Sequence, residues 1–449
     1  MGVKTLFLID GEHYPAVIRG AVRELVERDG LEPVALFWLG GTEKVGGVGE
    51  LQGLGLPVLV AREMLPDLAD ALEQLAPELV VDLSDEPVLD APMRFAIGSL
   101  ILKSGAIYRG ADFEFRPPRL EPAMSKPACS IIGTGKRSGK TAISAQLART
   151  MVERGHRPAV VVMGRGGPPR PEVLRGAEQE ITPEFLLAQC AAGKHAASDY
   201  FEDALTARVT TVGCRRCGGG MAGEAFVTNF LEGAAIAAGL PEDVIILEGS
   251  GTAIPPVQAS TRILVVSAAQ PFEVVGGYFG TYRLLLSDYV VITMCEKPFA
   301  DPPQIWRLEE EVRRVREDAR ILRTIFRPLP LAPIQGRSVY FTSTAPSEIG
   351  TVLRSYLEEK YDCQVVGISH SLSNRSRLLA DLETAPPFEL LLTELKAAAV
   401  DVATRYCVDR SLDVVYADNL PISVGEESER EFFGAVTERM LENAGKISA

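Results

Sequence analysis

Apolar and polar positions along the first 120 residues predict strands and helices in alternation. Short apolar runs predict strands, and apolar residues three and four positions apart predict the helices between them. The expected strands are Lys4–Asp10, Pro33–Gly40, Leu56–Ala61 and Leu79–Asp82, and the expected helices cover about Pro15–Arg28 and Leu65–Leu75. This order predicts a parallel sheet, and hence a small Rossmann-like α/β domain over residues 1–120. The domain contains no phosphate-binding loop, which favours a scaffolding or substrate-holding role.

The pattern changes after a linker that contains Pro117, Pro118, Pro122 and Pro127. The following strands have nearly continuous apolar runs, which is typical of buried parallel strands. They are expected at Cys129–Ile132, Pro158–Met163, Val244–Leu247, Ile263–Ser267 and Tyr289–Thr293. A charged surface helix is expected over Ile305–Ile321, and further strands near Ser338–Thr342, Cys363–Ile368 and Leu412–Ala417. We expect an α/β core over residues 125–300 and a C-terminal α/β region over 301–449 that continues it.

Composition and charge exclude several classes of function. The 449 residues carry a net charge of −14, which argues against sequence-independent binding to nucleic acid and against docking on anionic lipid. Seven cysteines, an odd number spread over a long chain, make a disulfide framework improbable. No apolar run reaches the roughly 18 residues that a membrane helix needs, and Asp10 interrupts the N-terminus before a signal-peptide core could form. We therefore expect a cytoplasmic protein.

Lysine is scarce in this chain, so its positions are informative. Three of the eleven lysines, Lys126, Lys136 and Lys140, fall within fifteen residues. Residues 129–141 read Cys-Ser-Ile-Ile-Gly-Thr-Gly-Lys-Arg-Ser-Gly-Lys-Thr and precede a helix-forming run at 142–149. An apolar strand, a glycine-rich turn, Lys-Thr and a helix are the parts of a phosphate loop. The sequence therefore predicts a P-loop NTPase core that holds ATP through Gly133, Thr134, Gly135, Arg137, Ser138, Gly139, Lys140 and Thr141.

Within this loop Lys140 is expected to bridge the β- and γ-phosphates, and Thr141 to bind Mg²⁺. The usual spacing would place a glycine at position 134, where this chain has Thr134. Gly-Thr-x-x-x-x-Gly-Lys-Thr resembles the loop of dethiobiotin synthetase and its relatives. The additional Lys136 is expected either to fold over the γ-phosphate as a second cation or to face solvent.

Two strand ends add candidate groups for the nucleotide. Glu248 ends the apolar strand that precedes Gly-Ser-Gly, where it would hold or orient Mg²⁺; the alternative is a surface acid at a strand end. Thr293 and Glu296 lie at the end of the strand where relatives of this class read the base, so they are candidates for adenine contacts.

Arginines in three loops are candidates for binding an anionic substrate, because the guanidinium fork suits phosphate and carboxylate. The first loop, 164–171, contains Arg165 and Arg170, and the second, 213–220, contains Arg215 and Arg216 between two cysteines. We interpret the second as a glycine-rich anion-binding loop, with a zinc site or a redox pair at Cys214 and Cys217 as alternatives. The third, 369–377, contains His370, Arg375 and Arg377, and a solvated helix start would explain it nearly as well.

Taken together, these motifs resemble the cyclic 2,3-diphosphoglycerate synthetase family. The resemblance is carried by the phosphate loop at 133–141, by Gly-Cys-Arg-Arg-Cys-Gly-Gly-Gly at 213–220, by Leu-Glu-Gly-Ser-Gly at 247–251, and by the N-terminal domain. It extends over essentially the whole chain.

The resemblance implies an ATP-dependent ligase that closes 2,3-diphosphoglycerate into an internal pyrophosphate and releases ADP and phosphate. It implies catalytic roles for Lys140, Lys136 and Glu248, with ATP, Mg²⁺ and K⁺ as cofactors and a homodimer as the assembly. A substrate with about five negative charges would need several of the candidate arginines to converge on it. Three alternatives remain open: a dethiobiotin-synthetase-like ligase, a small-molecule kinase, and a regulatory NTPase or metallochaperone with Cys214 and Cys217 as metal ligands.

Overall fold

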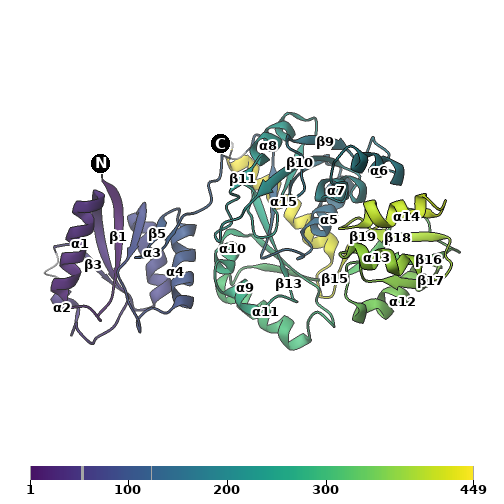
Figure 1. Ribbon diagram of the computed structural model, residues 1–449. Helices are drawn as coiled ribbons and strands as arrows, with labels where there is room; N and C mark the ends of the chain where they lie inside the picture. The colour runs from purple at the N-terminus through teal and green to yellow at the C-terminus, as the bar shows by residue number, and fades with distance from the viewer. Residues whose placement is uncertain (1, 52–54, 123, 448–449) are drawn as a thin grey trace. The chain divides into compact units, whose positions relative to one another are not determined.

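The computed structural model describes residues 2–51, 55–122 and 124–447, and the chain forms two compact units. Unit 1 consists of Met1–Pro118 with Pro271–Leu286 and Glu311–Glu317. Unit 2 consists of Arg119–Gln270, Ser287–Glu310 and Asp318–Ala449. Both units are α/β (Figure 1). Within the described ranges no helix is long and apolar enough to cross a lipid bilayer.

Unit 1 contains, among its described residues, a six-stranded sheet in the order β3-β2-β1-β4-β5-β6. Only the short β6 runs antiparallel to its neighbour. The strands are β1 (Val3–Ile9), β2 (Leu31–Trp38), β3 (Val58–Val60), β4 (Leu79–Asp82), β5 (Ile107–Arg109) and β6 (Glu114–Phe115). The helices are α1 (Pro15–Asp29), α2 (Val48–Leu51), α3 (Met64–Leu75), α4 (Ala91–Lys103), α9 (Phe272–Gly276) and α10 (Gly280–Leu286). The strand order confirms the Rossmann-like expectation for the N-terminal part.

Helix α4 explains why residues from the middle of the chain belong to unit 1. It is apolar on nearly all sides, and Ile97 and Ile101 are fully buried. The Phe95 ring on α4 and the Phe115 ring on β6 both pack edge-on against Phe279, with ring centroids 5.2 and 4.9 Å apart. These aromatic contacts hold α10 on α4.

Unit 2 is built on a single sheet with thirteen strands among its described residues. Its first half is parallel apart from two short edge strands, in the order β11-β10-β8-β12-β7-β13-β14-β15, with β9 paired to β10. The strands are β7 (Ala128–Gly133), β8 (Pro158–Gly164), β9 (Glu172–Arg175), β10 (Thr210–Cys217), β11 (Val227–Thr228), β12 (Val244–Glu248), β13 (Thr261–Ser267), β14 (Tyr289–Thr293) and β15 (Arg320–Pro330). The helices are α5 (Lys140–Glu153), α6 (Pro183–Ala191), α7 (Asp199–Thr206), α8 (Phe230–Gly239) and α11 (Pro302–Val315), of which α11 belongs to unit 2 only as far as Glu310.

Alternate residues of these parallel strands pack in two different hydrophobic cores, because successive side chains point to opposite faces of a sheet. Val160 and Ile246 pack in the core that contains α5 and α7. Val161 and Ile245 pack in the core that contains α8. Burial on both faces is the reason that these strands read as continuous apolar runs in the sequence.

The second half of the sheet begins where β15 pairs antiparallel with β19, from Thr324 opposite Ser423 to Pro330 opposite Ala417. From β19 the order continues through β18 and β16 to β17, all parallel. The elements are β16 (Ser338–Thr342), α12 (Gly350–Tyr361), β17 (Gln364–Ser369), α13 (Arg375–Glu383), β18 (Leu390–Glu394), α14 (Arg405–Val408), β19 (Asp413–Ser423) and α15 (Glu429–Ile447). The C-terminal region therefore continues the core sheet, as expected.

The last helix, α15, returns to the phosphate-loop half of the sheet and packs against α5 and β7 (Figure 1). Phe432, Phe433, Val436 and Met440 are fully buried in the core shared with α5. The end of the chain thus completes the nucleotide-binding half of unit 2.

Two sequence expectations about elements are wrong. The charged helix expected to reach Ile321 ends at Val315, and Ile321 lies in β15, because pairing of Arg320–Arg323 with β14 outweighs the local helical pattern. Residues 213–217 of the expected glycine-rich loop form the end of β10, which pairs with β8, so only 218–220 remain in a loop.

Candidate functional site

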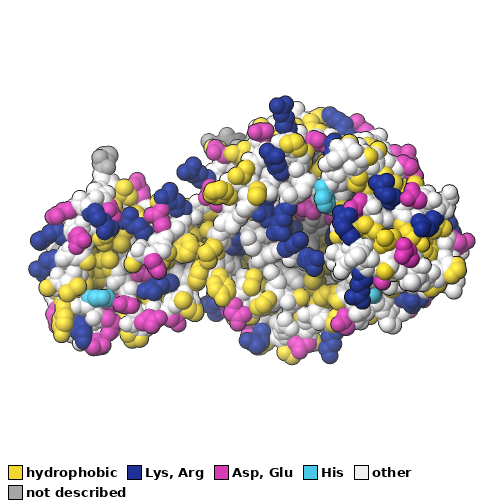
Figure 2. All heavy atoms as spheres, in the orientation of Figure 1, with side chains coloured by type: hydrophobic (Ala, Val, Ile, Leu, Met, Phe, Trp, Pro, Cys, Tyr) yellow, Lys and Arg dark blue, Asp and Glu magenta, His cyan; other side chains and the backbone are white. Residues whose placement is uncertain are grey.

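A cavity of about 940 Å³ opens in unit 2 at the carboxyl ends of the parallel strands. Figure 2 shows a hollow on this unit with Lys and Arg side chains gathered beside it. The phosphate loop from Lys136 to Ala142 forms one wall. Other lining segments include 164–166, 248–251 and the C-terminal residues 344–346, together with residues of 195–202, 294–299 and 394–397. Open parallel sheets place ligands at this edge.

The phosphate loop joins β7 to α5 as the sequence predicts. Gly139 takes a φ of +91° directly before Lys140, the first residue of α5. A Cβ atom on Gly139 would lie 2.4 Å from the ring of Phe326, so both conformation and space require glycine. The first N–H groups of α5 lie at the cavity, where they can bind phosphate oxygens.

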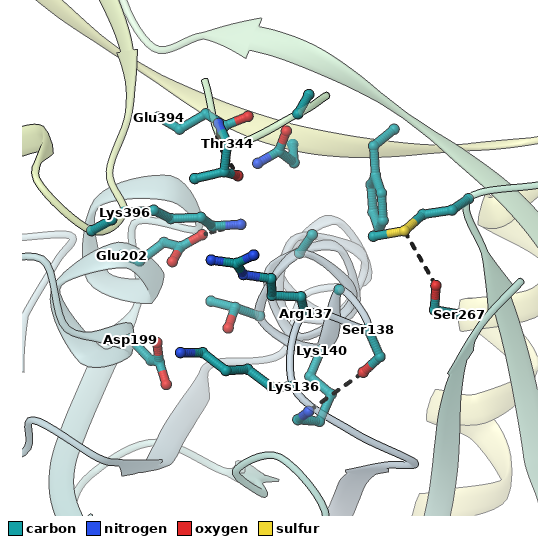
Figure 3. A pocket seen from close by; sticks show the side chains of 18 of the residues that line it. Lys136, Arg137, Ser138, Lys140, Asp199, Glu202, Ser267, Thr344, Glu394 and Lys396 are labelled. Carbon is teal, nitrogen blue, oxygen red and sulfur yellow. Dashed lines mark hydrogen bonds and ion pairs between the residues drawn. The ribbon is translucent and has the colours of Figure 1, made fainter. Parts of the chain in front are cut away.

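The ammonium of Lys140 lies inside the loop (Figure 3). Its Nζ donates to the Gly135 carbonyl at 2.9 Å and lies 3.4 Å from the Ser138 hydroxyl. Burial lowers the pKa of Lys140 to about 8, although Glu248 and Asp199 oppose this shift. A bound phosphate would restore full protonation, so the geometry suits the role predicted for this lysine.

Glu248 lies beside the phosphate loop and is 1% exposed. Its Oε1 accepts a hydrogen bond from the Thr141 hydroxyl at 2.8 Å. Burial raises the pKa of Glu248 to about 7, and the nearby Asp199 adds to the shift. Burial and then Glu248 raise the pKa of Asp203 well above its usual range. The alternative of a surface acid at position 248 is therefore excluded.

These buried carboxyl groups fit a divalent cation. Apart from the hydrogen-bonding contact between the Glu248 and Asp203 carboxyl groups themselves, Glu248 Oε2 and both carboxyl oxygens of Asp203 have no hydrogen-bond partner within the described part of the chain, and buried polar atoms are normally paired. No group of three or more His, Cys, Asp or Glu side chains among the described residues is arranged to hold a metal alone. Mg²⁺ typically takes one or two carboxylates and completes its shell with substrate phosphates and water. Thr141 and Glu248 suit that arrangement.

Unpaired cations gather around the same space. The side chains of Lys136, Arg137 and Arg165 line the cavity and form no hydrogen bond or ion pair with any described residue. Arg216 donates to the Ser250 carbonyl at 2.9 Å. A Cβ atom on Gly251 would lie 2.7 Å from Arg165 Nη2 and 3.2 Å from Arg216 Nη2, so both guanidinium groups crowd one glycine. Burial, and then Arg165, lowers the pKa of Arg216. Two like charges held this close favour an anion between them.

The two residues proposed to contact adenine lie differently. Thr293 is fully buried, and its hydroxyl donates to the Ser138 carbonyl at 2.8 Å. It therefore supports the phosphate loop and does not line the cavity. Glu296 does line the cavity, and its carboxylate is bound in a bidentate pair with Arg327 at 2.6 and 2.8 Å. The apolar part of the lining near Glu296 is formed by Met294, Phe299, Phe326 and Pro328.

Several of the arginines that the sequence singles out do not reach the cavity. Arg170, Arg215, Arg375 and Arg377 are all described, and none is among its lining residues. Arg215 and Arg216 are successive residues of β10 and point to opposite faces. Arg216 is not a lining residue of the cavity either, but its guanidinium lies beside Arg165 and Gly251, which are. Arg375 and Arg377 lie on α13, and Arg375 pairs with Asp401. This supports the helix-start interpretation of 369–377. His370 lines the cavity, and its Nδ1 donates to the Ala345 carbonyl at 2.8 Å.

Cys214 and Cys217 do not form a shared site. They are three residues apart on β10, so their side chains point to opposite faces of the strand. Cys214 is fully buried, and a Cβ atom on Gly233 of α8 would lie 2.2 Å from its sulfur, whereas Cys217 is exposed. Because the two sulfur atoms lie on opposite faces of β10, they cannot bind one zinc ion or form one redox pair, and the metallochaperone alternative loses its metal ligands.

Sequence reasoning missed the acids of α7 and a lysine from the C-terminal region. Asp199, Glu202 and Asp203 lie on one face of α7, at the i, i+3 and i+4 spacing that the sequence displays. Lys396 follows the buried strand β18 and lines the cavity. Lysine is scarce in this chain, so a lysine directly after an apolar strand could have marked Lys396 as a candidate site residue.

Comparisons with known proteins agree with this geometry. Three models of the cyclic 2,3-diphosphoglycerate synthetase family match: that of the N-terminal domain at residues 4–116, that of the P-loop domain at 128–325 and that of the C-terminal domain at 330–420. Three curated relatives are called cyclic 2,3-diphosphoglycerate synthetase. The protein of Rubrobacter xylanophilus is 51% identical over 94% of this chain and 95% of its own length.

The other two relatives carry the same name. The Methanothermus fervidus protein is 44% identical over 98% of this chain and 96% of its own length. The Methanothermobacter thermautotrophicus protein is 46% identical over 92% of this chain and 91% of its own length. With full-length identity at this level, and with a phosphate loop, buried acids and unpaired cations in one cavity, the chain belongs to the cyclic 2,3-diphosphoglycerate synthetase family.

Proposed function

We propose that this enzyme uses ATP to close 2,3-diphosphoglycerate into cyclic 2,3-diphosphoglycerate and releases ADP and phosphate. The observation that carries the proposal is the convergence, in one cavity, of a phosphate loop with cations that lack anionic partners. A substrate with two phosphates and a carboxylate supplies the missing negative charge. The near-full-length relatives that carry this activity in their names support the same conclusion.

The reaction proceeds in two displacements. An oxygen of one substrate phosphate attacks the γ-phosphorus of ATP, the bond from this phosphorus to the β–γ bridging oxygen breaks, and ADP leaves. An oxygen of the other substrate phosphate then attacks the inner phosphorus of the new diphosphate. The ring closes as the outer phosphate departs and takes up one proton. Both steps depend on alignment and charge neutralisation, which positioned cations supply.

Each group of the cavity has a proposed role in these steps. Lys140 and the N–H groups of α5 hold the β- and γ-phosphates. Lys136 and Arg137 cover the transferring phosphoryl group, and Arg165 with Arg216 binds the acceptor. Mg²⁺, bound through Thr141 and Glu248, would supply positive charge at the β- and γ-phosphate oxygens. The adenine base is proposed to lie against Met294, Phe299 and Phe326, near Glu296.

Phosphorus NMR tests this function. The protein is incubated with ATP, Mg²⁺, K⁺ and 2,3-diphosphoglycerate, and ADP, free phosphate and pyrophosphate-type resonances are followed. We expect a new pyrophosphate-type resonance that depends on the substrate and grows together with free phosphate. A phosphorylated product formed without free phosphate would instead identify a kinase that stops after the first transfer. Bound ATP with neither product would refute the synthetase activity.

Four further expectations from the sequence remain predictions: the K⁺ requirement, the homodimer, the domain boundaries and the cytoplasmic location. Activity in KCl compared with NaCl tests the K⁺ requirement, and sedimentation analysis tests the homodimer. Limited proteolysis tests the division into residues 1–120, 125–300 and 301–449, and cell fractionation tests the cytoplasmic location.

A further inference from the structure

Lys396 brings a cation of the C-terminal region into the nucleotide cavity. It lies two residues after Glu394, the last residue of β18. Its Nζ lies 3.3 Å from Oε1 of Glu202, which is 5% exposed on α7. Figure 3 shows the ammonium of Lys396 and the guanidinium of Arg137 pointing into the same space, with Lys136 extended toward Asp199. Two distant parts of unit 2 therefore direct positive charge to one point.

We infer that Lys396 binds a phosphate group of the acceptor substrate, and that Glu202 holds the ammonium in place until the substrate arrives. This inference rests on the proposed function and deepens it. It assigns a substrate contact in the C-terminal region to a residue that the sequence motifs do not single out.

The neighbouring Glu394, which also lines the cavity, has its oxygens occupied by donors of the protein. Its oxygens accept from the Ser343 hydroxyl at 2.7 Å, the Thr344 N–H at 3.0 Å and the Thr344 hydroxyl at 2.8 Å. Among the described residues Lys396 makes one close ion pair, with Glu202, while Glu394 and Asp418 lie near enough to act on its charge. Its side chain is 31% exposed, and it lines the cavity. An ammonium has three donors, so donors of Lys396 remain available to a ligand.

Ring closure gives this placement its chemical purpose. Two phosphates of one molecule must come within bonding distance, and their charges repel each other. Cations on the phosphate loop approach the substrate from one side. Lys396, on a different element, neutralises the second phosphate from the side of α7, where Asp199 and Glu202 would otherwise repel it. Charge neutralisation at both phosphates lowers the barrier to their approach.

Calorimetric titration of 2,3-diphosphoglycerate into the ADP-bound protein tests the inference without requiring turnover. The proteins compared are wild type, Lys396→Met, Glu202→Gln, the double variant, and Lys360→Met as a matched control. Lys360 is an exposed lysine of the same region that contacts Tyr356 and does not line the cavity. ADP binding measured alone reports whether each variant retains its fold.

Loss of one charge-assisted contact should weaken binding of the bisphosphate by about 10- to 100-fold in Lys396→Met. ADP affinity should stay near wild type, and Lys360→Met should bind both ligands normally. Glu202→Gln should bind the bisphosphate at least as tightly as wild type, since it frees the ammonium.

The double variant separates a substrate contact from mere neutralisation of Glu202. In Lys396→Met the buried carboxylate of Glu202 loses its partner, which could prevent folding. The double variant has a neutral Gln at position 202, so it can replace Lys396→Met in the comparison if the single variant does not fold. Bisphosphate binding that stays weak in the double variant supports the inference. Wild-type affinity in either Lys396→Met or the double variant overturns it, while leaving the proposed function standing. A wild-type protein that binds ADP and no 2,3-diphosphoglycerate refutes the proposed function, and this inference with it.

Discussion

Glu248→Gln should make the ligand-free protein more stable while it removes activity. Glu248 is buried, and its pKa rises from 4.5 to about 7. A raised pKa means that the carboxyl group favours folding at low pH, and that this contribution is lost as the pH rises from about 4.5 through about 7. At pH 8 the full shift corresponds to about 3 kcal/mol, and a gain of about 1–3 kcal/mol allows for coupling to its neighbours. The carboxamide keeps an oxygen that can accept from Thr141 Oγ1.

Urea unfolding at several pH values, in chelator and without nucleotide, measures this difference. The variant should exceed wild type at pH 8, and the two should converge near pH 4.5. The same substitution should lower turnover by about 100-fold or more, because the proposed magnesium ligand is lost. A variant that is less stable than wild type at pH 8, or a stability difference that does not change with pH, would refute the reasoning about a buried charge.

Three further predictions concern the cavity. Burial holds the pKa of Lys140 near 8, so the ADP affinity of the wild type should fall above about pH 8. Lys140→Met should bind ADP about 10- to 100-fold more weakly below that pH, and the difference should shrink as the pH rises above it, as measured by titration calorimetry. Gly139→Ala should reduce ADP affinity, because its Cβ would meet Phe326 at 2.4 Å, and adding Phe326→Ala should restore part of it; equal losses in both proteins would contradict the steric cause. Arg216→Ala should raise the KM for 2,3-diphosphoglycerate by about 10-fold or more, whereas Arg375→Ala, outside the cavity, should leave steady-state kinetics unchanged.

The strands and the phosphate loop could be predicted because their signals are local. The strand at Tyr289–Thr293 has the predicted bounds, since five buried residues in succession leave little choice of structure. Loop chemistry is equally local, because Gly139, Lys140 and Thr141 act through their spacing on one turn. Both fold class and family followed from such segments.

What the sequence did not reveal depends on contacts between distant segments. Arg215 and Arg216 are equivalent in the sequence, and only the pleat of β10 decides that Arg216 is the one that lies beside Arg165 and Gly251. Thr293 is chemically suited to a base contact, yet packing turns its hydroxyl to the phosphate loop. Lys396 enters the site because β15 pairs with β19 and carries the C-terminal strands to the cavity. No periodicity in a single segment encodes that pairing.

The position of α15 determines when the nucleotide-binding half can finish folding during synthesis. A ribosome adds Phe432, Phe433 and Met440, which fill the core beside α5, long after it has completed the phosphate loop. Until these residues emerge, apolar side chains of β7 and α5 remain uncovered, a condition that favours aggregation. Folding of this half therefore cannot be completed before α15 has left the ribosome. A message truncated before codon 429 yields a chain that carries every phosphate-loop residue and lacks the packing that holds the loop in place.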